Sequence, residues 1–380
     1  MTLKKPMIKF FYTPTHFFNE RESLKMKVQW SLPNIQKEDI QALKKVIKSG
    51  WFSMGPEVKK FEEKVASYLH INYSIGVSNG TAALDVALKC LDIKNGDEII
   101  LPALTYIATG NAVLYNNATP VFVDIDHTLN IDTSLIEEKI TDRTKAIMNI
   151  DLGGNPSNYK ELLRISKKHN IPLVVDGAQS FGSEYHGRKC CTHGLLNTTS
   201  FHSAKILTTI EGGMVLTEDE ELSLKARSIR NQGEISKYVH QYLGNNYRMI
   251  DFLAVLGGPQ LERMKETVKQ RKKKVKYYKE NLKNAEYPKE LPNTFNCNFF
   301  FLILVDNRDK LNKYLNSNGI ETRITYPIPI NEQPIFRRYS KENFLVSKEI
   351  SERVISLPIH HKLSIQQQDF IIKKINKFSG

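Results

Sequence analysis

Short apolar runs alternate with segments of helical length over residues 37–175. Alternation of this kind predicts a parallel sheet wrapped by helices, because each helix returns the chain to the same edge of the sheet. The runs PLVVD and PVFVD are apolar without polar interruptions, which is typical of strands buried on both faces. The expected helices are 37–49, 57–69, 81–91, 106–116 and 159–169, and the expected strands are 74–77, 98–101, 120–123, 146–150 and 172–175.

The pattern changes after residue 258. A long helical pattern begins near Pro259 and is followed by apolar segments at 298–305 and 320–325 and a terminal helix at 366–378. We therefore predict an α/β fold with a mostly parallel central sheet and a smaller C-terminal α+β domain. The expected division is an N-terminal extension of uncertain order (1–27), a large domain (28–258) and a small domain (259–380).

Composition and charge narrow the possible partners. The formal net charge of +13 is concentrated in the run KQRKKKVK at 269–276, where apolar residues at helical spacing leave the lysines on the other face. A solvated helix face explains this run better than a nucleic-acid site, and no nucleic-acid motif accompanies it. No apolar stretch approaches the ~18 residues of a membrane span, and the N-terminus lacks a secretory pattern. We expect a cytoplasmic protein without a membrane or nucleic-acid partner.

The four cysteines give no sign of a metal site. They are Cys90, Cys190, Cys191 and Cys297, and none shows a zinc-like Cys or His spacing. We expect reduced thiols and no metal.

Three segments carry candidate chemistry, and the first is VSNGTAA at 77–83. A strand enters a glycine-bearing turn that opens onto an alanine-rich helix. Small residues let backbone amides approach a ligand, and a helix N-terminus favours an anion such as phosphate. Such turns are also common without any ligand.

The second segment, VVDGAQ, places Asp176 at the end of a buried strand. A buried carboxylate is costly unless a cation meets it, and a protonated pyridine nitrogen is such a cation. Capping of the next turn is an equally good explanation for this aspartate alone.

The third segment, SFHSAK, ends in Lys205 and is followed by an EGG turn and a strand at 214–216. A lysine among small and apolar residues loses solvation, which lowers its pKa and suits it to Schiff-base chemistry. Most lysines are ordinary surface residues, so this segment gains weight from its order after the other two. A phosphate cup, then a strand-end acid, then a lysine about thirty residues later is the layout of fold-type-I pyridoxal enzymes.

The chain resembles the DegT/StrS family of sugar aminotransferases from about residue 28 to 378. The resembling segments include GPEVKKFEEKVASYL, VSNGTAALDVALKCLDIKNGDEIILPALTYIAT, VVDGAQSFG, TTSFHSAKILTTIEGGMV, NNYRMIDFLAVLG and TYPIPI. The resemblance implies a pyridoxal 5'-phosphate (PLP) enzyme that aminates a nucleotide-linked keto-sugar, with an amino acid such as glutamate as donor.

The same resemblance assigns roles to residues. It makes Lys205 the lysine that carries the cofactor, Asp176 the partner of the pyridine nitrogen, and Gln179 a residue near the ring's phenolic oxygen. The other expected cofactor contacts are Gly80, Thr81 and Ser200 at the phosphate, Tyr106 stacked on the ring, and Asn246 and Arg248 reaching into a neighbouring subunit's site. A homodimer is therefore expected.

The sugar pocket is expected to involve His202, Tyr326 and Asn331. Asn331 and Gln232 stand where many relatives carry histidine, so the sugar and the aminated carbon stay open. A keto-cyclitol is an alternative acceptor. A PLP-dependent sugar dehydratase is disfavoured because those enzymes replace the lysine with histidine, and a non-catalytic PLP-binding regulator is disfavoured because no added DNA-binding motif is present.

Overall fold

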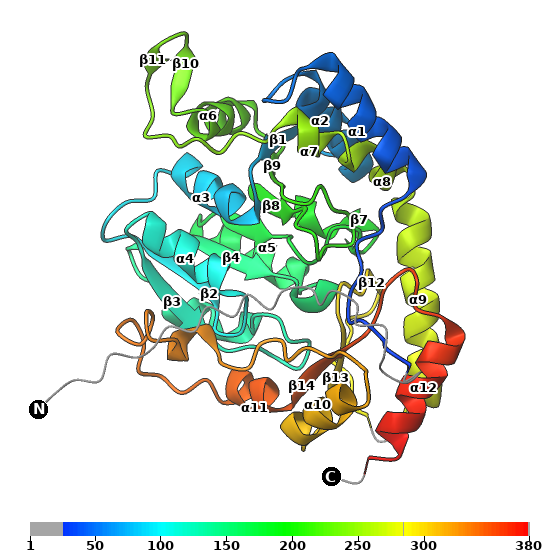
Figure 1. The fold of residues 1–380 in the computed structure, drawn as a ribbon. Coiled ribbons are helices and arrows are strands. Elements are labelled where there is room, and N and C mark those ends of the chain that lie inside the picture. Colours follow the sequence, from blue (N-terminus) through cyan, green and yellow to red (C-terminus); the bar gives the residue numbers. More distant parts are fainter. Residues whose placement is uncertain (1–25, 284, 379–380) are drawn as a thin grey trace, which may run out of the picture.

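A seven-stranded sheet forms the centre of the computed structural model, which describes residues 26–283 and 285–378 (Figure 1). Five adjacent strands are parallel, and β9 runs antiparallel to both of its neighbours. The predicted α/β class with a mostly parallel sheet is confirmed. In spatial order the strands are β1 (Tyr73–Val77), β9 (Gly213–Thr217), β8 (Leu196–Ser200), β5 (Leu173–Asp176), β4 (Thr144–Ile150), β2 (Glu98–Pro102) and β3 (Thr119–Val123).

Helices cover both faces of this sheet. Ile99 and Leu101 of β2 pack in the same core as α3 and α4, whereas Ile100 between them packs in the core that contains α5. Successive side chains of a strand point to opposite faces, so both faces are buried, as the uninterrupted apolar runs predicted. The helices of this region are α1 (Lys37–Ser49), α2 (Pro56–Leu69), α3 (Gly80–Cys90), α4 (Ile107–Tyr115), α5 (Tyr159–His169), α6 (Glu220–Arg230) and α7 (Asp251–Ala254).

Strand β8 lies near the middle of the sheet although its sequence, LNTTS, is mostly polar. All five residues are buried. Asn197 accepts a hydrogen bond from the Gly194 amide at 2.7 Å and donates to the Gly194 carbonyl at 3.0 Å. Buried polar side chains are tolerated when they are hydrogen-bonded, so hydrophobic periodicity alone does not reveal this strand.

The C-terminal region differs from the prediction in two places. The helix expected to begin near Pro259 is two helices, α8 (Gly257–Glu262) and α9 (Met264–Asn281), separated at Arg263. The segment 320–325 forms isolated bridges, between Val28 and Ile320 and between Arg323 and Ser356. The remaining main elements are β13 (Phe301–Leu304), β14 (Val354–Leu357), α10 (Arg308–Ser317), α11 (Leu345–Arg353) and α12 (Ile365–Asn376).

The C-terminal region has its own apolar core. Strands β13 and β14 pair antiparallel, and their side chains pack with α9, α10 and α12. Val28 belongs to this core, so the start of the described chain lies against the C-terminal segments. The boundary between residues 258 and 259 stays a prediction, as does the extension 1–27, most of which lies outside the described residues.

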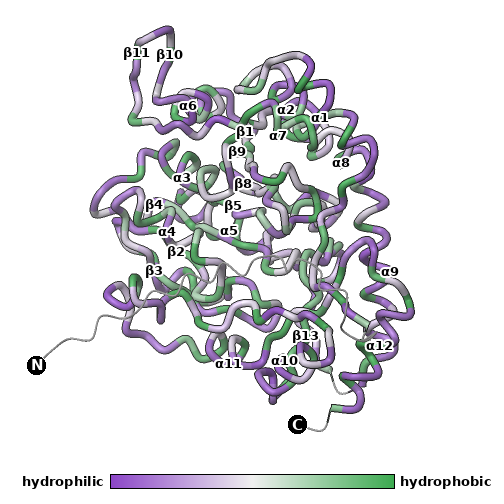
Figure 2. The backbone as a smooth tube through the Cα atoms, viewed as in Figure 1, coloured by the Kyte–Doolittle hydropathy of each residue, from purple (hydrophilic) through white to green (hydrophobic). Residues whose placement is uncertain are grey.

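Several short strands form small sheets outside the main sheet. The hairpin β10 (Glu234–Ser236) and β11 (Val239–His240) projects away from the body of the molecule (Figure 1). Three further strands, β6 (Glu184–Tyr185), β7 (Arg188–Lys189) and β12 (Thr294–Phe295), form a separate small sheet. Hydrophobic residues concentrate on the central strands, while α9 is largely hydrophilic (Figure 2).

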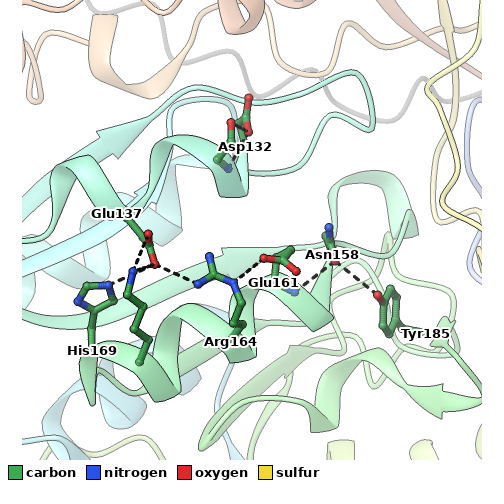
Figure 3. A network of polar contacts seen from close by, with 9 residues as sticks. Asp132, Glu137, Asn158, Glu161, Arg164, His169 and Tyr185 are labelled. Atoms are coloured by element: carbon green, nitrogen blue, oxygen red, sulfur yellow. Dashed lines mark hydrogen bonds and ion pairs between the residues drawn. The ribbon is translucent and has the colours of Figure 1, made fainter.

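A polar network links α5 to the turn before β4 (Figure 3). Glu137 contacts Arg164, Lys168 and His169, and a hydrogen bond from Lys168 is the main reason that the pKa of Glu137 is lowered. Arg164 and Lys168 are exposed and Glu137 and His169 are half-exposed, and ion pairs at such surface positions contribute little to stability. The network is a surface feature rather than a site.

No helix within residues 26–283 and 285–378 is long and apolar enough to cross a bilayer. The same residues contain no group of His, Cys, Asp and Glu side chains arranged to hold a metal ion.

Candidate active site

A cavity of about 860 Å³ lies at the carboxyl ends of β5 and β8 and the N-terminus of α3. Open α/β sheets bind ligands at this edge. The predicted site residues in its wall are Gly80, Thr81, Tyr106, Asp176, Gln179, Ser200, His202, Lys205 and Tyr326. Segments that are far apart in sequence therefore meet around one space.

Asp176 ends β5 and is buried, with 6% of its surface exposed. Thr109 donates a hydrogen bond to its Oδ2 at 3.0 Å, and the Ala178 amide donates to Oδ1 at 3.1 Å. Burial raises the pKa of this carboxyl, while the Ala178 amide and Lys205 oppose that rise. The carboxylate thus lines a cavity and forms no direct ion pair with the residues that the structure describes, a position that favours a cationic ligand atom.

Lys205 lies on the loop between β8 and β9. Burial lowers its pKa from 10.5 to about 8, against the opposing effect of the Asp176 carboxylate. Its Nζ lies 4.5 Å from the centre of the Phe299 ring. A lysine with such a pKa is neutral in about one molecule in ten at pH 7, far more often than an ordinary lysine, and the neutral amine is the nucleophilic form.

The turn before α3 forms a cradle of backbone amides. Asn79 caps the helix by accepting a hydrogen bond from the Ala82 amide at 2.8 Å. A Cβ on Gly80 would lie 2.8 Å from the Cβ of Ser200, so only glycine allows this turn to approach the end of β8. The first amides of a helix have no partner within the helix and favour anions.

Gln179 and two tyrosines form another wall. Gln179 accepts a hydrogen bond from the Gly153 amide at 2.8 Å and donates to the Tyr326 hydroxyl at 3.3 Å. Burial, with a further contribution from Asp176, raises the pKa of Tyr326. The Tyr106 ring is 5.9 Å from that of Tyr326 and 55% exposed, so its face is free to pack on a planar ligand.

His202 lies at the exposed side of the cavity. Its Nδ1 accepts a hydrogen bond from the Ala204 amide at 3.2 Å, and its Nε2 lies 3.8 Å from Glu211. The ring is thereby held over the loop that carries Lys205. Its contact with a sugar stays a prediction.

Three predicted residues do not line the cavity. Asn246 forms a backbone bridge with Asn231, and the Arg248 guanidinium donates to the Asn231 side chain at 2.8 Å. Asn331 is buried in a short 3₁₀ turn, and its Oδ1 finds no hydrogen-bond partner among the described residues. Their expected roles, two in a neighbouring subunit and one at the sugar, stay predictions.

Several residues of the site escaped the sequence analysis. Thr109 is buried behind the cavity wall, one helical turn after Tyr106, and its hydroxyl reaches Asp176, a spacing that could have revealed it. Phe299 comes from the C-terminal region and carries no local signal of its position beside Lys205. Trp30, Tyr247 and Arg323 also line the cavity.

The cavity suits the expected cofactor in three independent respects. It offers a helix N-terminus for a phosphate, a buried acid for a ring nitrogen and an amine with a lowered pKa for an aldehyde. A Cβ on Gly80 would collide with Ser200, so the residue type is explained by the close approach of the turn to β8.

Known proteins resemble this chain over most of its length. The GDP-perosamine synthase of Escherichia coli O157:H7 is 36% identical over 355 residues, which cover 91% of this chain and 97% of that protein. The structure of S. venezuelae DesV matches with a TM-score of 0.86 and 31% identity, covering 89% of this chain and 93% of that one.

A second solved structure contains the cofactor. The E. coli GDP-4-keto-6-deoxy-D-mannose-3-dehydratase with bound hydrated PLP has a TM-score of 0.86 and 25% identity, covering 92% of this chain and all of that one. PLP dependence is therefore implied by structural neighbours as well as by the residues above. The family model of the DegT/DnrJ/EryC1/StrS aminotransferases matches residues 33–376, and the chain belongs to this family.

Proposed function

We propose that this protein uses PLP to move an amino group from an amino acid, glutamate by preference, to a nucleotide-linked keto-sugar. The observation that carries the proposal is that Asp176 and Lys205 line one cavity, with burial raising the pKa of the acid and lowering that of the amine. Titratable groups perturbed by burial in a cleft are typical of catalytic sites.

Each residue has a task in this proposal. When bound, PLP supplies an aldehyde that condenses with amines and a ring that accepts electrons. Asp176 holds the proton on the pyridine nitrogen, and Thr109 fixes the Asp176 carboxylate by its hydrogen bond. Lys205 Nζ would hold the cofactor through its aldehyde, and as a free amine it would serve as the base and acid that moves the proton at the reacting carbon.

The remaining lining residues bind and orient. Gly80, Thr81 and Ser200 hold the phosphate at the α3 N-terminus, Tyr106 stacks on the ring, and Gln179 lies beside its phenolic oxygen. The retained lysine argues against a dehydratase, whose family members carry histidine at that position.

The test is incubation of the purified protein with PLP, glutamate and a panel of nucleotide keto-sugars, followed by mass spectrometry. We expect the sugar to exchange its carbonyl oxygen for an amino group and glutamate to become 2-oxoglutarate. Amination of a keto-cyclitol instead would correct the acceptor class, and the absence of any amino transfer from glutamate or other amino acids would refute the proposal.

We further propose that the working unit is a homodimer in the cytoplasm. The projecting hairpin β10–β11 and the residues beside it expose Ile235 (52%), Tyr238 (80%), Val239 (51%) and Leu243 (86%). Clustered exposed apolar side chains mark interaction sites. The segment with Asn246 and Arg248 follows this hairpin directly, so a partner bound there would bring both residues to a neighbouring cavity.

Mixing two inactive variants tests the dimer. If Asn246 serves the partner's cavity, Lys205→Ala and Asn246→Ala subunits together form mixed dimers with one intact site and recover activity. Dimers that form but show no recovery would place Asn246 in its own subunit, and a monomeric active protein would rule the dimer out.

A further inference from the structure

A second cavity, of about 210 Å³, also has Lys205 in its wall. Its other walls are the segment around Asn34, one face of α9 and His361. The α9 residues recur at helical spacing and therefore face the cavity together; they are Glu266, Thr267, Gln270, Arg271 and Lys274. Within the basic run that the sequence analysis treated as a solvated face, Gln270, Arg271 and Lys274 are half-buried, whereas Lys269, Lys272, Lys273 and Lys276 are exposed.

Positive charge is in excess around this cavity. Its wall contains Lys205, Arg263, Arg271 and Lys274, against the single carboxylate of Glu266. Arg263 forms an ion pair with buried Asp39, which lies behind it. Four cations set against two carboxylates leave an excess of two positive charges among the described residues.

The cations of this cavity influence one another. Burial and the neighbouring Arg271 lower the pKa of Lys274. Burial and the cations Lys362 and Lys274 lower the pKa of His361. Like charges held together in this way favour binding of an anion.

Lys274 is the cation best placed to meet a ligand. Its hydrogen bond within the described residues is a long one, 3.5 Å from Nζ to the His361 carbonyl oxygen. Arg271, in contrast, donates to the carbonyls of Asn298, Phe299 and Ile359 at 2.8–2.9 Å. Arg271 therefore fixes the backbone of Phe299, the residue whose ring lies beside Lys205 Nζ, and joins the walls of the two cavities.

We propose that this cavity is an oxyanion site next to Lys205, with Lys274 as its main ligand-binding cation. Its volume is below the roughly 300–1,000 Å³ of pockets that enclose whole drug-sized molecules, so it takes a terminal carboxylate or phosphate group. Two substrates of the proposed function, on which this part of the inference rests, carry such a group: the distal carboxylate of a dicarboxylic donor and the phosphates of the nucleotide.

Calorimetric titration of the PLP-loaded protein tests the site without turnover. The probes are glutarate, a dicarboxylate that has no amine to react, and inorganic pyrophosphate. We expect at least one to bind, and Lys274→Gln to weaken that binding about tenfold or more, the loss expected for a charge-assisted hydrogen bond. Tighter binding of glutarate assigns the site to the donor, and tighter binding of pyrophosphate assigns it to the nucleotide.

Two variants make the test specific. Lys274→Arg keeps the charge and should bind the probe within about threefold of the original protein. Lys269→Gln removes an exposed lysine of the same helix and should leave binding unchanged. Equal affinity of Lys274→Gln and the original protein, or no binding of either probe, would overturn the proposal.

The result is independent of the proposed function. Probe binding needs no amino transfer, so an oxyanion site could be found in a protein that fails to aminate any sugar. Conversely, the protein could be an active aminotransferase whose Lys274→Gln variant binds both probes with the original affinity. That result would refute the oxyanion site and leave the proposed function standing.

Discussion

Two buried groups of charges in this protein have opposite arrangements. Glu62 of α2 forms ion pairs with Arg227 at 2.7 Å and with Arg230, and both Glu62 and Arg230 also bind the backbone of Gly76 in β1. Asp176 is similarly buried and Lys205 is half-buried; neither forms a direct ion pair with another described residue, and both face a cavity. Burial is common to the two groups, whereas pairing is not.

This difference distinguishes buried charges that are paired within the protein from buried charges that indicate a ligand site. The Glu62 group satisfies its charges within the protein and holds β1, the strand that leads into the turn at Gly80. The pKa values of Asp176 and Lys205 are shifted by burial. A cofactor nitrogen beside Asp176 and an aldehyde bound to Lys205 would offset the cost of that burial. We therefore expect substitutions in the first group to change stability and substitutions in the second to change activity.

Removal of Lys205 should have the largest effect. We expect Lys205→Ala to lower the rate of amino transfer by about 10³-fold or more, because both the anchor and the proton carrier are lost. The measurement is the steady-state rate with glutamate and an accepted keto-sugar. An active Lys205→Ala protein would contradict the assignment, and Lys269→Ala is the control.

The same variant should not lose stability in the cofactor-free state. Because folding lowers the pKa of Lys205 from 10.5 to about 8, its contribution to stability is present above pH 10.5 and is lost as the pH falls through 8. At pH 7 the buried amine is therefore a cost, and Lys205→Ala should unfold at an equal or higher temperature. Marked destabilisation would give Lys205 a structural role.

Removal of Glu62 should lower the free energy of unfolding rather than the activity, because Glu62 belongs to the paired group of charges. Glu62→Gln leaves Arg230 buried without its carboxylate, and loss of one partner of a buried pair costs about 3–5 kcal/mol. Urea unfolding would show this loss, while the rate per folded molecule should change much less. Glu63→Gln is the matched control, since its exposed side chain lies 4.0 Å from Lys59 at the surface. Equal stability of the two variants would contradict the account.

Asp176→Asn should lower activity by about 10²-fold or more, because the amide cannot hold the ring-nitrogen proton.

Folding raises the pKa of Asp176 above 3.8, so its contribution to stability is present below pH 3.8 and is lost as the pH rises through the folded value. The cofactor-free variant should thus gain stability relative to the original protein at pH 8 and lose that advantage near pH 3.8. Unfolding curves at several pH values check this sign; a disadvantage at pH 8 would contradict it.

The smallest effect is expected at the phosphate cradle. Gly80→Ala places a Cβ 2.8 Å from Ser200 and should weaken PLP binding about tenfold by shifting the turn. Fluorescence titration with PLP gives the affinity. Gly258→Ala is the control, because the nearest atom there is the flexible Lys64 amine at 3.3 Å. Equal affinities would show that the turn at Gly80 is not a cofactor contact.

The sequence predicted the parts of the fold that follow hydrophobic periodicity. Helix 159–169 and helix 37–49 agree with α5 and α1, and the buried strands agree within a few residues. The polar strand β8 and the break at Arg263 were not foreseen, because hydrogen bonding and backbone geometry decide them rather than apolar spacing.

The residues of the site also divide into those that the sequence could place and those that it could not. Asp176 ends β5, and Gly80 and Lys205 lie in the segments that follow β1 and β8, so the topology of the sheet brings all three to one cavity. Phe299 and Lys274 arrive from the C-terminal region, whose packing against Lys205 depends on tertiary contacts that no local pattern records.

The most direct test of the central claim is reduction of the PLP-loaded protein with borohydride, followed by digestion and mass spectrometry. The account predicts a pyridoxyl-phosphate mass increment on the peptide that contains Lys205, with loss of the visible absorbance band. An increment confined to another lysine, or none at all, would contradict the account.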